Sequence, residues 1–148
     1  MSETLPLTEP RLRFFADLRV EVGAPQEVGS TVHGLRRLIP ITGGQAVGDG
    51  WQAHVLPGGA DFQLIVSSTL AELDARYTLQ TDAGDLIYVH NRAIRSGPAE
   101  VDPSQIYFRC SPRFETASPA LRWISERMFT GTGARFPDAV AMRFWELM

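Results

Sequence analysis

A strict alternation of apolar and polar residues is the feature that most constrains the fold of this chain. In RLRFFADLRVEV, residues 11–22, every even position is apolar and most odd positions are charged. Successive side chains of a β-strand point to opposite faces, so this period of two predicts a half-buried strand. The same pattern recurs in residues 73–81 and 140–147. The inward set of the first strand is then expected to be Leu12, Phe14, Ala16, Leu18, Val20 and Val22.

Glycine and proline clusters separate the apolar runs at short intervals. We interpret six of them as turns: GAPQEVG (23–29), TGG (42–44), GDG (48–50), PGGAD (57–61), DAG (82–84) and GTG (131–133). DAG lies between two strand patterns and predicts a tight hairpin in which glycine takes a positive φ. A longer connection is expected over 92–104, a length at which loops in compact domains often serve binding.

The fold class follows from many short strands and the lack of long helical periods. We predict an all-β protein, a single closed antiparallel β-barrel of the lipocalin kind with about eight to ten strands. One domain should span residues 1–148. At most one short helix is expected, in SPALRWISERM (118–128), with Ser118 as N-cap and Pro119 at the first helical position. That segment could instead form a strand.

Composition excludes several classes of protein. The chain is 44% hydrophobic and 21% charged with a net charge of −3, as in an ordinary soluble domain. The sequence has no basic stripe with interleaved aromatics of the kind that binds nucleic acid. It also has no apolar stretch long enough to span a membrane. The single cysteine, Cys110, and a first segment without a signal-peptide pattern predict a cytoplasmic protein.

The available side chains also limit the chemistry. All 14 basic residues are arginine, which excludes Schiff-base chemistry and lysine-dependent phosphate loops. His33, His54 and His90 fall on separate predicted strands without paired spacing, so a metal site is not favoured. Cys110 alternates with apolar neighbours and is expected in the core. We therefore expect neither a metal nor a cofactor.

Five segments together resemble a known family. They are RRLIPITGG (36–44), VLPGGADFQ (55–63), LDARYTLQTDAGDLIYVHNR (73–92), YFRCSPRFET (107–116) and FTGTGARFPDAV (129–140). In this order they resemble uncharacterised protein family 0311, also known as domain of unknown function 3237. The resemblance implies a small single-domain antiparallel β-barrel and brings no established active site. The chain departs from the family pattern at Phe62, where an indole is expected, and at Ser96, where a histidine is expected.

Asp61 is the first candidate for chemistry, because it follows a Gly-Gly pair and opens the strand DFQLIVS. The carboxylate either closes its own turn by accepting backbone hydrogen bonds or points into the barrel. Inside a barrel, burial would raise its pKa and suit it to general base catalysis. Glu115, which lies near Tyr107 and Arg109 in the sequence, could move a proton in the same way, or it could form a structural pair with Arg109 across a hairpin.

The leading functional hypothesis is a small-molecule pocket in the barrel interior. Aromatic and charged side chains on the predicted strands should bind an aromatic or carboxylate-bearing ligand: Tyr77, Tyr88, Tyr107, Arg109 and Arg76. Arg76 could instead pair with Asp74 on a solvated outer face. The alternative function is a cofactor-free isomerase, lyase or hydratase that uses Asp61 or Glu115. A third possibility is a packed barrel with a structural role, in which an apolar outer face forms a homo-oligomer.

Overall fold

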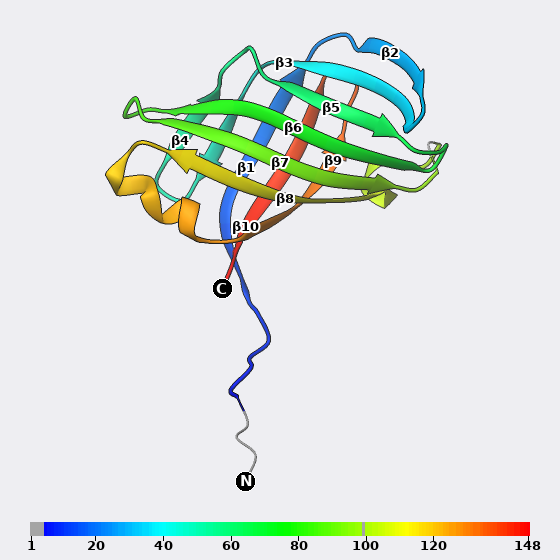
Figure 1. Cartoon of the computed structure of the whole chain (residues 1–148). Coiled ribbons are helices and arrows are strands. Elements are labelled where there is room, and N and C mark those ends of the chain that lie inside the picture. The colour runs from blue at the N-terminus through cyan, green and yellow to red at the C-terminus, as the bar shows by residue number, and fades with distance from the viewer. Residues whose placement is uncertain (1–4, 99) are drawn as a thin grey trace.

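Ten strands and two short 3₁₀ helices follow one another along the chain in the computed structural model, which describes residues 5–98 and 100–148 (Figure 1). The strands are β1 (Leu12–Val22), β2 (Gln26–Thr31), β3 (Gly34–Gly48), β4 (Gln52–Val55), β5 (Ala60–Ile65), β6 (Leu70–Thr81), β7 (Leu86–Ser96), β8 (Tyr107–Thr116), β9 (Phe129–Arg135) and β10 (Ala139–Leu147). The helices are η1 (Pro103–Gln105) and η2 (Pro119–Glu126). Among the described residues, no helix has the length and apolar character needed to cross a membrane.

The sheet closes on itself, because β1 pairs with β10 on one side and with β3 on the other. From β10 the order continues through β9, β8, β7 and β6, and every pairing is antiparallel. β4 and β5 share one position between β3 and β6, so the circuit has eight positions. The predicted closed antiparallel barrel is confirmed. Figure 1 shows η2 and β4 at one end of the barrel and β2 at the other.

The core fills the interior from the inward positions of the alternating strands. β6 buries Leu73, Tyr77 and Leu79, and β10 buries Met142 and Phe144, as the period of two predicts. The pattern is wrong for the start of β1. A register shift between Phe14 and Ala16 moves Phe15 to the inside, so Phe14 is 42% exposed. A β-bulge adds one residue to a strand and so reverses the facing of all residues on one side of it.

Three predicted turns are wrong in whole or in part, because they contain glycines that lie within strands. The last four residues of GAPQEVG belong to β2. TGG falls inside β3, where Gly44 has a φ of +127° beside a register shift in the pairing with β1. GTG falls inside β9. A Cβ on Gly131 would lie 2.8 Å from Sγ of Cys110, and one on Gly133 would lie 2.8 Å from the ring of Phe108. These glycines make room for neighbouring core side chains rather than for a bend.

The predicted hairpin, helix and long connection are all found near their expected positions. DAG forms the tight connection between β6 and β7, and Gly84 has a φ of +92°. The expected helix is η2, with Ser118 as N-cap and Pro119 in its first turn. The long connection is shorter than expected, because β7 continues to Ser96 and η1 occupies part of the segment up to β8.

Candidate functional site

A small cavity of about 50 Å³, here called the chamber, lies inside the barrel and is lined by residues of β1, β3 and β5 to β10. Its wall is mainly apolar and includes Leu73, Ala75 and Ala93. Six polar side chains also line it: Asp61, Gln63, Tyr77, Asn91, Arg95 and Arg135. A mostly apolar cavity with a few converging polar groups is the usual composition of a ligand site.

The PGGAD segment directs Asp61 into this chamber. It joins β4 to β5 within one position of the barrel, and Gly58 has the positive φ of +110° that the connection requires. Gly59 lies so close to β6 that an added Cβ would overlap the carbonyl oxygen of Arg76. β5 then alternates from its first residues, so that Asp61 and Gln63 point inward while Phe62 is 45% exposed. The carboxylate therefore does not serve its own turn.

Asp61 is held by two hydrogen bonds in a buried position. Its Oδ2 accepts from Nε2 of Gln63 at 2.7 Å, and its Oδ1 accepts from the backbone N–H of Asp74 at 3.1 Å. Burial raises the pKa of Asp61 above its ordinary value, although both hydrogen bonds and the charge of Arg95 act in the opposite direction. A carboxyl with a raised pKa can exchange protons nearer to neutral pH than an exposed one.

Arginines surround this single carboxylate. Arg37 donates from Nε to Oε1 of Gln63 at 2.8 Å, which joins Arg37 to Asp61 through the Gln63 amide. Burial, together with the charges of Arg135 and Arg37, lowers the pKa of Arg95 to about 10. Burial and Arg37 also lower the pKa of Arg135. Guanidinium groups keep their charge at these values, so this part of the interior has an excess of positive charge.

Two buried oxygen atoms face the interior without a hydrogen-bond partner among the described residues. They are Oη of Tyr77 and Oδ1 of Asn91. Tyr77 is 3% exposed, and burial raises the pKa of its hydroxyl strongly. A buried polar atom without a partner costs about 1–3 kcal/mol. Native proteins contain few such atoms, and a bound molecule is one explanation for them.

A second hollow, the vestibule, continues from the chamber toward the outside. Its volume is about 220 Å³, and it shares Arg95, Phe108 and Arg135 with the chamber. The β5–β6 turn contributes Ser67 and Thr69, and the segment before β8 contributes side chains that include Pro103 and Ile106. The two hollows are therefore neighbours, and both arginines line each of them.

Of the site residues predicted from the sequence, only Asp61 and Tyr77 reach the chamber. The others lie on the outer face of the barrel, so the prediction that they line its interior is wrong: Glu115, Tyr88, Tyr107, Arg109 and Arg76. On β8 the inward residues are Phe108, Cys110 and Phe114. The odd-numbered residues of that strand must then face outward.

The outward residues interact with one another instead. The guanidinium of Arg109 lies 4.7 Å from the ring centre of Tyr107, a cation–π contact. Arg76 lies 3.5 Å from Asp74, whose Oδ1 also meets Nε2 of His90 at 2.7 Å. The interpretation of Asp74 and Arg76 as a partly solvated outer pair is confirmed.

Sequence reasoning missed Gln63, Asn91, Arg95 and Arg135. A signal for two of them was present in β7, because Ile87 and Val89 begin an inward set that continues through Asn91 to Arg95. For Arg135 the signal was hidden, since GTG was interpreted as a turn. Cys110 is buried, as predicted, and burial raises the pKa of its thiol to about 11. Such a thiol is a poor nucleophile.

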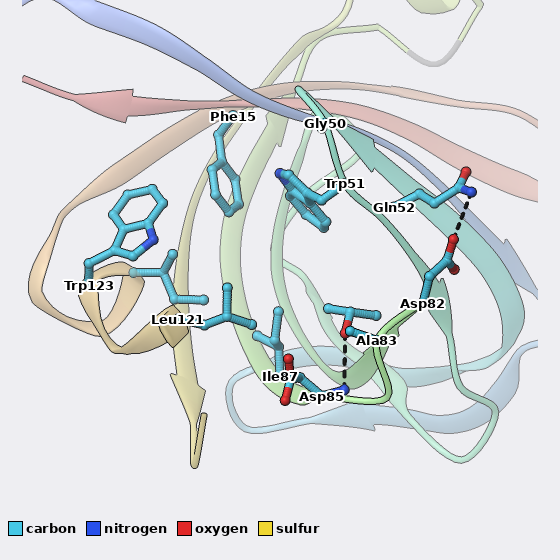
Figure 2. Close-up of a pocket in the computed structure, with 13 residues that line it drawn as sticks. Phe15, Gly50, Trp51, Gln52, Asp82, Ala83, Asp85, Ile87, Leu121 and Trp123 are labelled. Atoms are coloured by element: carbon cyan, nitrogen blue, oxygen red, sulfur yellow. Dashed lines mark hydrogen bonds between the residues drawn. The ribbon is translucent and has the colours of Figure 1, made fainter. Parts of the chain in front are cut away.

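A larger hollow, the basin, opens at the opposite end of the barrel, beside η2. Its volume is about 680 Å³. Figure 2 shows Phe15 and Trp51 projecting side by side into it, with Leu121 and Trp123 arriving from η2. Asp82 and Asp85, on the β6–β7 hairpin, form the other side. The basin shares no lining residue with the chamber or the vestibule.

No group of three or more His, Cys, Asp or Glu side chains within the described ranges could hold a metal ion. His33 and His54 are exposed, and His90 is engaged with Asp74 on the outer face.

Comparisons with known proteins agree with the fold. A UPF0311 protein of Rhodopseudomonas palustris (strain TIE-1) is 42% identical, over 93% of this chain and 95% of its own. A crystal structure of a conserved protein of unknown function from Rhodopseudomonas palustris matches with a TM-score of 0.91 and 38% identity, over 96% of this chain and all of that one. A β-barrel like protein of Acinetobacter baumannii AYE matches with a TM-score of 0.91 and 35% identity, over 98% of this chain and all of that one. The family model described as protein of unknown function (DUF3237) matches residues 10–147, and the chain belongs to that family, as the resemblance indicated.

Proposed function

We propose that this protein binds a small organic molecule with a carboxylate group inside the barrel. The observation that carries the proposal is the excess of guanidinium over carboxylate groups around the chamber. Arg95 and Arg135 lie where the chamber meets the vestibule, and both are partly desolvated. A planar guanidinium suits bidentate hydrogen bonding to a carboxylate, and low exposure to water strengthens the interaction.

The two hollows set the size and polarity of the ligand. The chamber holds only a few heavy atoms, so the body of the ligand lies in the vestibule against apolar side chains such as Ile106 and Phe108. The unpartnered Tyr77 and Asn91 oxygens offer a donor and an acceptor to a second polar group on the ligand. An aryl acid with a keto or hydroxyl group has these features, and phenylpyruvate is a suitable probe.

Calorimetric titration tests the proposal with benzoate, phenylacetate and phenylpyruvate, each compared with its neutral amide. We expect binding of at least one acid and weaker binding of its amide. Arg95→Met should weaken this binding roughly tenfold to hundredfold, the usual value of hydrogen bonds to a charged group. Arg92→Met is the matched control, because Arg92 lies on the same strand and faces outward. Equal affinity of acids and amides, no binding by any acid, or an equal effect of the control would contradict the proposal.

A second candidate function is cofactor-free proton transfer by Asp61, which the raised pKa of its carboxyl favours. With a bound 2-oxo acid, the carboxylate of Asp61 would take a proton from the carbon next to the keto group. The electron pair of that C–H bond would move to the keto oxygen, and the hydroxyl of Tyr77 would stabilise the resulting enolate. Return of the proton to a different position would give an isomerase.

Hydrogen–deuterium exchange separates catalysis from binding. In deuterated buffer, the wild type should speed the loss of the C3 proton signal of phenylpyruvate, followed by NMR. Asp61→Asn should still bind the acid but lose this acceleration. If the acid binds and exchange is no faster than in buffer alone, the protein is a binding protein only. If Asp61→Asn exchanges at the wild-type rate, Asp61 is not the base.

A further inference from the structure

We propose that the basin is a second binding site, which takes an organic cation with a flat apolar body. It lies at the end of the barrel opposite the vestibule, so the proposal does not depend on the chamber. Three aromatic rings gather on one side of the basin. The ring centres of Phe15 and Trp51 are 5.3 Å apart, and those of Phe15 and Trp123 are 6.0 Å apart.

The local sequence keeps these rings in place and accessible. An added Cβ on Gly48 would overlap the indole of Trp51, so the glycine lets the indole lie directly against the backbone of β3. Trp123 is 43% exposed although η2 holds it beside the barrel. Figure 2 shows that Trp51 and Trp123 approach the hollow from different elements, with Phe15 between them. Trp123 adjoins Trp51, Leu121 and Phe15 in the basin lining, and a contiguous apolar patch of this kind points to a binding surface.

The charged residues that line the basin determine whether a cation or an anion fits there. Asp82 and Asp85 are its only charged lining residues, and neither forms an ion pair with another described residue. Asp82 accepts only from Nε2 of Gln52, at 2.8 Å. The faces of Trp and Phe rings carry negative partial charge and also attract cations. Both sides of the basin therefore favour positive charge.

No basic residue is among those that line the basin. Arg13 and Arg127 line the adjoining groove, where each pairs with Glu146, at 3.3 and 2.6 Å. The chemical class that fits is an aryl or alkyl ammonium compound, with its body against the rings and its nitrogen toward the hairpin carboxylates. The basin and the chamber would then select ligands of opposite charge.

Benzyltrimethylammonium is a suitable probe, with benzyl alcohol as its neutral counterpart. NMR titration of ¹⁵N-labelled protein should shift the indole N–H signals of Trp51 and Trp123 and leave that of Trp145 in place. Trp145 lies on β10, outside the basin lining, and serves as an internal control. The ammonium compound should bind at least fivefold more tightly than the alcohol, since cation–π and charge contributions add up to that order.

Two variants distinguish charge selection from simple hydrophobic binding. Asp82→Asn with Asp85→Asn should reduce the preference for the ammonium compound at least threefold. Asp138→Asn removes the same charge at the vestibule end and should leave the preference unchanged. The proposal is overturned if the probe shifts neither indole signal, if benzyl alcohol binds equally well, or if the double variant keeps the full preference.

Discussion

The two ends of this barrel share the same strands, yet the interior behind the basin is packed with aromatic rings, whereas the interior toward the vestibule encloses the small charged chamber. Toward η2, the rings of Phe15, Phe114, Phe129 and Phe144 lie within 4.8–6.1 Å of one another in successive pairs. Toward the vestibule, the same inward positions hold small or polar residues, among them Ala75, Ala93, Asn91 and Asp61. The position of the cavity is therefore set by side-chain size at inward positions, because the strand topology is continuous through both halves.

The two halves should also differ in whether their residues contribute to stability or to ligand binding. Close packing in the η2 half buries large apolar side chains, which is the main source of folding free energy. The chamber half buries a carboxylate, guanidinium groups and two unpartnered oxygens, all of which oppose folding unless a ligand satisfies them. We expect substitutions of the buried rings in the first half to change stability, and substitutions of the polar chamber residues to change binding of the carboxylate ligand.

The largest effect is expected at Phe144, which has no exposed surface and lies in the packed half. Phe144→Ala should lower the free energy of unfolding by about 3–5 kcal/mol, as is usual for a buried phenylalanine. Urea denaturation followed by circular dichroism measures this change. Phe62→Ala, at an outward position of β5, is the control and should cost much less. Equal losses at both positions would contradict the division of the barrel into a packed half and a chamber half.

Gly59→Ala should lower the free energy of unfolding by about 1–3 kcal/mol, because the new methyl group would overlap the backbone of β6. The strain falls two residues before Asp61, so the affinity for the carboxylate ligand should fall as well. In Gly50→Ala, the added Cβ meets no atom within 4 Å, and only its φ of +77° is unfavourable. This control should cost less and leave binding unchanged. A smaller loss at Gly59 than at Gly50 would show that β5 can move away from β6.

Asp61→Asn should change how stability depends on pH. The folded-state pKa of Asp61 lies above 3.8, so protonation favours the folded state. The stabilisation that comes from protonating Asp61 is fully present below the pKa of the unfolded chain. It is lost as the pH rises through the pKa of Asp61 in the folded protein. Between pH 7 and pH 4 the wild type should therefore gain stability relative to the variant. A constant difference over this range would mean that Asp61 stays ionised.

Tyr77→Phe should have the smallest effect on the free protein. Its hydroxyl has no partner among the described residues, so its removal should raise the free energy of unfolding by about 1 kcal/mol, the lower end of the cost of an unpartnered buried atom. The same variant should weaken ligand binding, measured by calorimetry. A loss of stability well above 1 kcal/mol without a ligand would show that the hydroxyl is already satisfied.

The sequence was sufficient for the architecture because the period of two is a property of each strand alone. It predicted the closed antiparallel barrel, the inward set of β6, the hairpin at Gly84 and the position of η2. It was insufficient where neighbouring strands decide the outcome. The bulge in β1 depends on its pairing with β10, and the glycines of β9 depend on the rings of Phe108 and Phe144.

The candidate site was only partly predictable for the same reason. The alternation in residues 73–81 identifies Tyr77 as inward, whereas for Asp61 the sequence left open a turn residue or an inward acid. Tyr107 and Arg109 were chosen for their chemistry, although Phe108 and Cys110 already occupy the inward face of β8. Arg95 and Arg135 come from strands that are far apart in the sequence, and only closure of the barrel brings them to one cavity.

A crystal structure of the protein with phenylpyruvate tests the central claim most directly. We expect the carboxylate to lie between Arg95 and Arg135, with the ring in the vestibule and the keto oxygen toward Tyr77. A chamber that stays empty while the acid binds on the outer face, at Arg109 and Tyr107, would contradict it.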